Sequence, residues 1–113
     1  MYAALFEMDS MFGRHQYIFE GNSPVSVMVE FENEQSLECL IRHGRYEESA
    51  KGQLALDKLE DVYNKYVAGT ITMDDIASID IKISIGAIRC CLVAEGEDAI
   101  AAIKAQYPKA RSR

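Results

Sequence analysis

The chain has 113 residues, 49% of them hydrophobic and 27% charged, which is enough apolar material for one domain with one core. No apolar run approaches the roughly 18 residues that a membrane-spanning helix needs. The first residues carry Glu7 and Asp9 and no basic stretch, unlike a secretory signal, and the three cysteines cannot all pair. We therefore expect one cytoplasmic domain over residues 1–113.

The net charge of −6 is unevenly distributed along the chain. Residues 104–113 hold four basic side chains and no acid, whereas residues 1–103 hold 8 basic against 18 acidic side chains, a net −10. Such an acidic body repels phosphate groups and favours a basic partner. We thus expect no nucleic acid and no membrane as a partner, and a short basic C-terminal tail at about 108–113. Solubility alone also explains an acidic composition.

The N-terminal third predicts three strands. Residues 2–8 and 15–20 read as two strands of a hairpin, and the segment EGNSP after them is a turn signal. Residues 25–31, VSVMVEF, alternate apolar and polar side chains, which is typical of a half-buried strand. The apolar face of that strand would hold Val25, Val27, Val29 and Phe31.

The middle of the chain predicts two helices and a capped turn. Asn33 can cap a helix that ends at Gly44, and a second helix over 53–68 ends at Gly69. The apolar stripe of the second helix would hold Leu56, Leu59, Tyr63, Tyr66 and Val67. Thr72 then caps the short turn MDDIAS, whose two aspartates suit a helix N-terminus.

Apolar and polar residues alternate from Ile79 to Leu92, which predicts strand structure. At Gly86 the alternation changes phase: the apolar residues occupy odd positions before it and even positions after it. A two-residue turn at Gly86-Ala87 would pair 85 with 88, 83 with 90 and 81 with 92. A bulge at Gly86 in one bent strand would repair the phase equally well. A last helix begins near residue 96 and stops near Pro108.

Strands in hairpins, with helices between and after them, predict an α+β fold. We expect an antiparallel sheet of four to five strands with about three helices packed on one face, in the order βββααβ(β)α.

Two arrangements of cysteines are candidates for chemical reactivity. Neighbours on a strand point to opposite faces, so Cys90 should be buried with Ile88 and Leu92. Cys91 should point the other way with Arg89 and Val93, and Arg89 would lower its pKa if both are exposed.

Cys39 and His43 lie four residues apart, a spacing that suits a metal or a Cys-His nucleophile on one helical face. A zinc site would need two more ligands, and only Cys91 and His15 are candidates. The favoured interpretation of His43 is that its cation lies near a helix C-terminus, where positive charge is stabilised. The sequence predicts neither a metal nor a cofactor, and it contains no phosphate loop, nucleophile elbow or His-Glu zinc motif.

Acidic residues at regular spacing give the main functional prediction. As strand and helix neighbours they would form an acidic ridge, defined as Glu30, Glu32, Glu34 and Glu38. We expect a small protein-binding module of the immunity or inhibitor type that captures a basic partner on this ridge. The plainer interpretation is a solvated face that limits aggregation.

Three alternatives remain open at this point. A small enzyme or small-molecule-binding domain would have a pocket between sheet and helices, lined by Tyr17, Tyr63 and Tyr66. The chain could also be a structural subunit of a larger assembly. Finally, VSVMVEF or IKISIGAIRCCLV at a sheet edge would let two copies pair as a homodimer.

Overall fold

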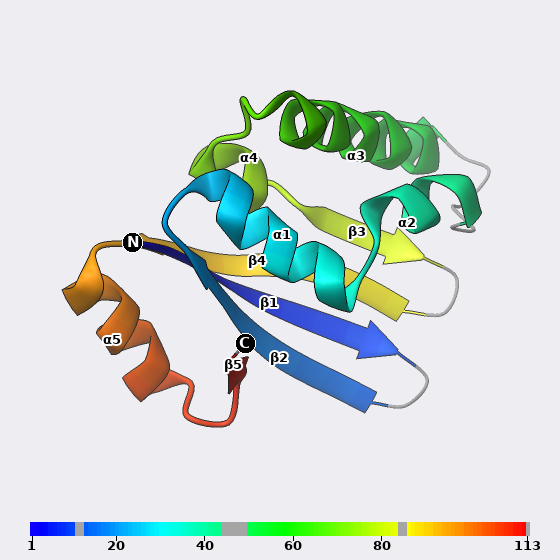
Figure 1. The fold of residues 1–113 in the computed structure, drawn as a ribbon. Coiled ribbons are helices and arrows are strands. Elements are labelled where there is room, and N and C mark those ends of the chain that lie inside the picture. Colours follow the sequence, from blue (N-terminus) through cyan, green and yellow to red (C-terminus); the bar gives the residue numbers. More distant parts are fainter. Residues whose placement is uncertain (11–12, 44–49, 84–85, 113) are drawn as a thin grey trace.

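The computed structural model describes residues 1–10, 13–43, 50–83 and 86–112, and it confirms the predicted α+β class. These residues form five strands and five helices (Figure 1). The strands are β1 (Tyr2–Ser10), β2 (Gly13–Gly21), β3 (Asp80–Ile83), β4 (Gly86–Glu95) and β5 (Arg111–Ser112). The helices are α1 (Pro24–Glu34), α2 (Leu37–His43), α3 (Ala50–Ala68), α4 (Met73–Ala77) and α5 (Glu97–Gln106).

All five strands join one sheet in the order β3-β4-β1-β2-β5. Every neighbouring pair is antiparallel except β2 and β5, which run parallel. The predicted hairpin of residues 2–8 and 15–20 is confirmed as β1 and β2, each a few residues longer than expected. The C-terminal residues expected to be a tail contain β5, at the outer edge of β2.

The predicted strand over 25–31 is wrong, because these residues lie in helix α1. The Ser23 hydroxyl accepts a hydrogen bond from the Ser26 amide at 3.1 Å, and Pro24 occupies the first helical turn. In the helix Val27, Met28 and Phe31 are buried together, while Val29 is 43% exposed. The same residues alternate with a period of two, so the pattern alone was ambiguous.

The helices that follow differ in detail from the prediction. Asn33 lies within α1 and does not cap α2, whose first turn is capped by the Ser36 hydroxyl accepting from the Cys39 amide at 3.2 Å. The predicted stop at Gly44 lies outside the described residues.

Helix α3 confirms the predicted helix over 53–68. Its apolar stripe differs at one position, because Val67 is 67% exposed and Val62 is buried instead. The predicted cap of α4 is confirmed, since the Thr72 hydroxyl accepts from the Asp75 amide while the Asp75 carboxylate accepts from the Thr72 amide.

The hairpin prediction for β3 and β4 is confirmed, but its register is not. Ile81 pairs with Ile88 and Ile83 pairs with Gly86, so Gly86 is the first residue of β4 and not part of the turn. A side chain at Gly86 would collide with the backbone carbonyl oxygen of Asp9, so this close strand packing requires glycine.

A bulge interrupts the pairing of β4 with β1, where Phe6 faces Cys90 but Leu5 faces Leu92. The extra residue is Cys91, and it reverses the inward and outward order of the side chains after it. Leu92, expected on the buried face with Ile88 and Cys90, is therefore 39% exposed. Val93, expected with Cys91, packs against the larger core instead.

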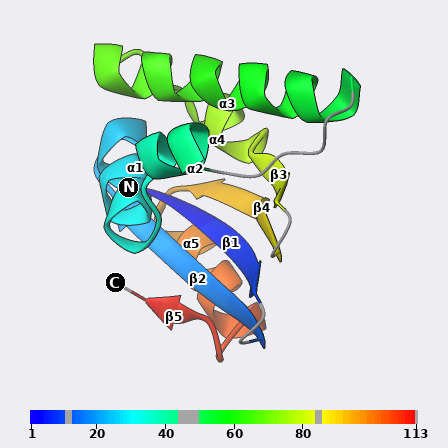
Figure 2. The same ribbon diagram turned by 90° about the vertical axis from the view of Figure 1, so that its right-hand side faces the viewer.

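Helices cover both faces of the sheet, in contrast to the single covered face predicted from the sequence. Helices α1 to α4 lie on one side and α5 on the other (Figures 1 and 2). Consecutive residues of β1 and β2 are buried, among them Leu5 and Phe6, and a strand that is apolar on both faces needs a layer on each side.

The larger core centres on Phe6, Phe19 and Phe31, whose ring centres lie 4.7 to 5.9 Å apart. The smaller core packs α5 onto the sheet and consists of Ala3, Leu5, Ile18, Ile100 and Ile103.

Of the two segments predicted as pairing edges for a homodimer, VSVMVEF is no strand. The other contains β3, which does form a sheet edge, with α3 running beside it in both views (Figures 1 and 2). Among the described residues, no helix is long and apolar enough to cross a lipid bilayer.

Candidate functional site

An open hollow of about 380 Å³ lies where β2 ends and α1 begins. It brings together residues from the N-terminus, the end of β2 and the exposed side of α1. The lining residues are Met1, Glu20, Gly21, Asn22, Ser26, Val29 and Glu30. We refer to this site as the acidic hollow.

The sharp turn from β2 into α1 shapes the acidic hollow. Gly21 packs against the backbone of Ser26, with space for no side chain: an added Cβ would lie 2.9 Å from the Ser26 carbonyl carbon. The capping bond from Ser26 to Ser23 fixes the direction in which α1 starts. As a result Glu30, two turns into α1, lies across the hollow from the end of β2.

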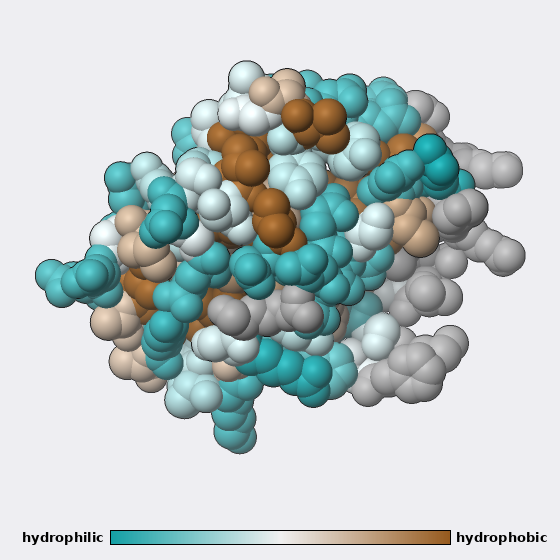
Figure 3. Space-filling view, viewed as in Figure 1, coloured by the Kyte–Doolittle hydropathy of each residue, from teal (hydrophilic) through white to brown (hydrophobic). Residues whose placement is uncertain are grey.

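The acidic hollow combines negative charge with exposed apolar surface. Glu20 and Glu30 supply two carboxylates, and Glu20 is held by the Lys104 ammonium of α5 at 2.9 Å. Met1 is 49% and Val29 43% exposed, so two of the most exposed large hydrophobic residues lie at its walls. Figure 3 shows hydrophobic residues reaching the surface over α1 and α3 among hydrophilic neighbours.

The four glutamates of the predicted acidic ridge do not lie on one face of the protein. Glu30 and Glu34 are four apart on α1, but Glu32 projects from a different side of that helix because the segment is not a strand. Glu38 lies on α2, where it pairs with Arg42 at 2.7 Å. Only Glu30 lines the acidic hollow.

Glu32 has a structural role that the sequence did not reveal. Its carboxylate oxygens lie 3.2 and 3.3 Å from the Leu37 amide, which donates to them at the start of α2. Burial raises the pKa of Glu32, and this effect outweighs the opposing influence of the amide.

The three predicted pocket tyrosines do not line the acidic hollow. Tyr17 is buried on β2, stacked on Phe19 at 5.7 Å between ring centres. Tyr63 and Tyr66 lie half-buried on α3, and the pKa of Tyr66 is raised by burial and by the nearby Glu32 charge. Tyr17 thus belongs to the larger core itself, and the two α3 tyrosines pack against that core.

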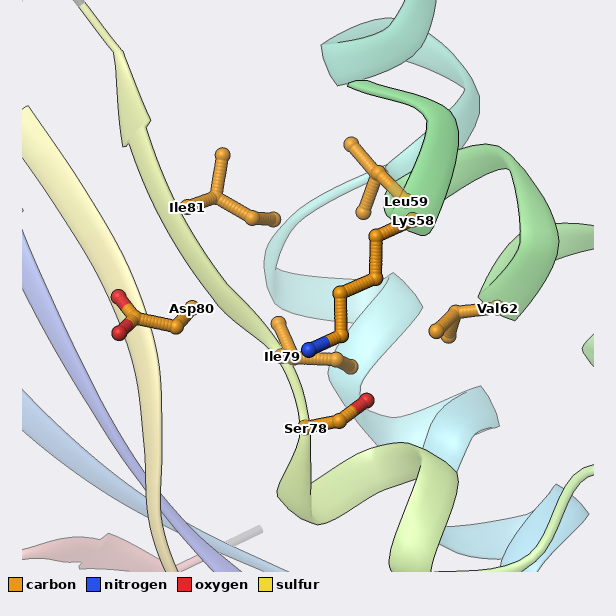
Figure 4. A pocket seen from close by; sticks show the side chains of 7 residues that line it. All are labelled: Lys58, Leu59, Val62, Ser78, Ile79, Asp80 and Ile81. Carbon is orange, nitrogen blue, oxygen red and sulfur yellow. The ribbon is translucent and has the colours of Figure 1, made fainter. Parts of the chain in front are cut away.

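A second hollow between α3 and β3 is far smaller. Its volume is about 10 Å³, room for about one water molecule. Figure 4 shows Leu59 and Val62 of α3 facing Ile79 and Ile81, with Lys58 extending toward Ser78 and Asp80 pointing away on the other side of the strand. This crevice is a packing seam between helix and sheet.

The cysteines occupy three different environments and none is in a disulfide. Cys90 is buried as predicted, and burial raises its pKa to about 12. The Cys91 thiol donates to the Glu7 carboxylate at 3.3 Å. Arg89 pairs with the same carboxylate at 3.1 Å. The pKa of Cys91 is raised, mainly by burial and then by Glu7, and these two effects outweigh the lowering by Arg89 that the sequence predicted.

The proposed Cys39-His43 pair cannot be placed, because the His43 side chain lies outside the described residues. Cys39 is exposed on α2. Within the part of the chain that the structure describes, no three His, Cys, Asp or Glu side chains are grouped so that they could hold a metal ion.

Sequence reasoning missed Met1, Glu20 and Val29, which share the acidic hollow with Glu30. The signal that could have found them is the segment EGNSP followed by a helix, because a Ser-Pro helix start folds α1 back beside the end of β2. Comparison with known proteins gives no guide to this site, since no family model, curated protein or solved structure shows a significant match to the chain.

Proposed function

We propose that the chain is a protein-binding module that captures a basic partner in the acidic hollow. The observation that carries the proposal is the joint presence of two carboxylates, Glu20 and Glu30, and two exposed apolar side chains, Met1 and Val29, around one hollow. Lysine and arginine side chains have the matching chemistry, an aliphatic stem that ends in a cation. An immunity or inhibitor role is the form of this function that the sequence favours.

The charge of the whole body supports the same proposal. Residues 1–103 carry a net −10, which attracts a basic protein over a distance of about a Debye length, roughly 8 Å at physiological salt. Such steering accelerates association, while the local carboxylates and apolar contacts determine how long the complex lasts. The two contributions can be separated by experiment.

The test compares Glu30→Lys with a matched control, Glu60→Lys, an exposed position on α3 away from the hollow. Both variants change the net charge equally. Affinity capture from the protein's own source, followed by binding kinetics with the captured protein, should show that Glu60→Lys keeps the same partner as wild type. Glu30→Lys should lose it or dissociate about 10-fold faster or more. Equal effects of both variants would contradict a site at the acidic hollow.

The alternatives from the sequence stay predictions. A small-molecule site or an enzyme would need polar groups converging on an enclosed pocket. Neither the open acidic hollow nor the one-water crevice beside α3 offers such a pocket. A structural subunit of a larger assembly would use the same exposed surfaces permanently, and captured complexes that resist high salt would favour that role.

A further inference from the structure

The chain places a basic strand of its own on the outer edge of β2. Arg111 and Ser112 of β5 pair in parallel with Tyr17 and Ile18 (Figure 2). The Arg111 guanidinium lies 5.7 Å over the centre of the Tyr17 ring and donates to the Tyr17 hydroxyl at 3.4 Å. The β2 edge is thereby shown to accept an extended segment that carries an arginine.

The hold of β5 on this edge is small. Its backbone pairing covers two exposed residues, Arg111 and Ser112, and the other contacts are those of Arg111 with Tyr17 and of Ala110 with the smaller core. No other described strand pairs with the outer edge of β2, which has nine residues. A short strand with so few contacts belongs to the least stable parts of a fold, so another segment can compete with it.

The parallel register connects this edge to the acidic hollow. Each further residue of a segment lying like β5 advances one residue along β2, about 3.3 Å. Beyond the position opposite Ile18 it would pass Phe19 and then Glu20 and Gly21, which line the hollow. A basic residue three positions after an arginine at the Tyr17 position would therefore lie opposite Glu20.

We propose that the partner's recognition element is an extended basic segment that replaces β5 on β2. It runs parallel to β2, stacks an arginine on Tyr17 and places a second basic residue, three positions later, at Glu20. Backbone hydrogen bonds to a sheet edge would supply affinity, and the two charged positions would supply specificity, as in other cases of strand addition. The chain's own β5 is then an internal competitor. This inference rests on the proposed function and names its ligand.

The test uses the full chain and a labelled peptide, Ala-Ala-Arg-Ser-Val-Lys-Ala. The variant Arg111→Glu removes the stacking on Tyr17 and should loosen β5. The control Lys109→Glu makes the same charge change outside β5. While β5 occupies the β2 edge, the peptide binds only the fraction of molecules in which that edge is free. Release of β5 therefore raises the apparent affinity for the peptide by the inverse of that fraction. Arg111→Glu should bind the peptide about fivefold more tightly than Lys109→Glu does.

Two further readouts address the mode of binding. Of Tyr17 and Ile18, the residue whose N–H faces β5 should exchange its amide faster in Arg111→Glu and more slowly again when the peptide is added, whereas the amide that faces β1 should change little. A peptide of the same composition with arginine and lysine adjacent should bind more weakly. Equal affinities for the two variants, or for the two peptides, would overturn the inference, as would unchanged exchange on peptide addition.

Failure of this inference and failure of the proposed function are distinguishable. If Glu30→Lys loses the captured partner but Arg111→Glu does not tighten peptide binding, the acidic hollow stands and the edge does not take the segment. If Arg111→Glu tightens peptide binding while Glu30→Lys keeps the partner, the strand edge is a binding track but the hollow is not the capture site.

Discussion

The carboxylate of Glu32 in α1 accepts a hydrogen bond from the backbone amide of Leu37, which begins α2. This contact joins two helices across a short connection and supplies a partner for an amide that α2 itself cannot satisfy. Burial of the carboxylate raises the pKa of Glu32, although the hydrogen bond from the Leu37 amide by itself lowers it.

The effect of replacing Glu32 on stability should therefore depend on whether the new side chain can accept a hydrogen bond from the Leu37 amide. Glu32→Ala leaves the Leu37 amide without this acceptor and should lower the free energy of unfolding by about 1–2 kcal/mol. Glu32→Gln keeps an amide oxygen at the site and should cost less. Urea denaturation at neutral pH measures both, and equal losses would show that the carboxylate charge, not the hydrogen bond, matters.

The raised pKa of Glu32 also predicts the sign of a pH effect. The folded state binds this proton more tightly than the unfolded chain, so the contribution is fully present below the unfolded pKa and is lost as the pH rises through the folded pKa. The stability of wild type relative to Glu32→Gln should thus fall as the pH rises above the unfolded pKa, about 4.3. A relative stability that rises over this range would contradict a raised pKa.

The helical assignment of residues 24–34 makes a direct prediction for two valines. In a strand Val27 and Val29 would share one face, whereas in α1 Val27 is buried and Val29 is exposed. Val27→Ala should cost about 2 kcal/mol of folding free energy, from lost burial and a residual cavity. Val29→Ala should change it by less than about 0.5 kcal/mol. Chemical denaturation of the two variants decides, and equal costs would favour the strand.

The capping box of α4 predicts an acid-sensitive contribution. The pKa of Asp75 is lowered, first by the hydrogen bond from the Thr72 amide and also by Lys65, whose ammonium lies 3.2 Å from the Asp75 carboxylate. A lowered pKa means stability that is present above the unfolded pKa and lost as the pH falls through the folded pKa. Asp75→Asn should be destabilising at pH 7 and nearly neutral near pH 2–3.

The variant Thr72→Ala serves as the companion measurement for α4. It removes the hydroxyl that accepts the Asp75 amide and should cost about 1 kcal/mol at neutral pH. The Thr72 hydroxyl also donates to the Asp75 carboxylate at 3.0 Å, so that part of the loss should shrink in acid, while the part due to the Asp75 amide should persist. Thermal melts at the two pH values compare the variants.

Gly86 should be the least replaceable glycine of the sheet. A Cβ there meets the carbonyl of Asp9 in β1, which is backbone and cannot rotate away. Gly86→Ala should therefore force β4 away from β1 and cost about 2–4 kcal/mol, at the upper end of single substitutions. A variant that melts within a degree or two of wild type would show that the strands can separate locally at no cost.

Much of the fold could be predicted where the hydrophobic periodicity and the helix-stop or turn signals agree. Helix α3 up to Gly69 and helix α5 before Pro108 each combine one clear period with a stop signal, and the β1-β2 hairpin is followed by the turn signal EGNSP. Residues 25–31 fit both periods, and the Ser-Pro helix start that distinguishes them lies in the segment EGNSP, which also fits a turn. The β4 bulge depends on pairing with β1 and leaves no local signal.

The candidate site was only partly accessible from the sequence. Glu30 was predicted, though as a member of a strand face, and in the structure it lines the acidic hollow from a helix. Met1 and Glu20 join it because two segments that are distant in sequence end at the same place, an arrangement that composition and periodicity do not encode. Glu32 was predicted for binding, but its carboxylate accepts a hydrogen bond from the Leu37 amide at the start of α2.

The bulge at Cys91 means that β4 consists, in effect, of two half-strands of opposite parity. Before the bulge Ile88 and Cys90, at even positions, contact the larger core, and after it Val93, at an odd position, does. The pattern of positions that tolerate polar substitutions should change at the same point. A polar residue should be tolerated at Leu92 but not at Ile88, although both are even-numbered positions. The adjacent cysteines thus lie where β4 switches the faces of its side chains. On either side of them, opposite sets of positions point toward the larger core.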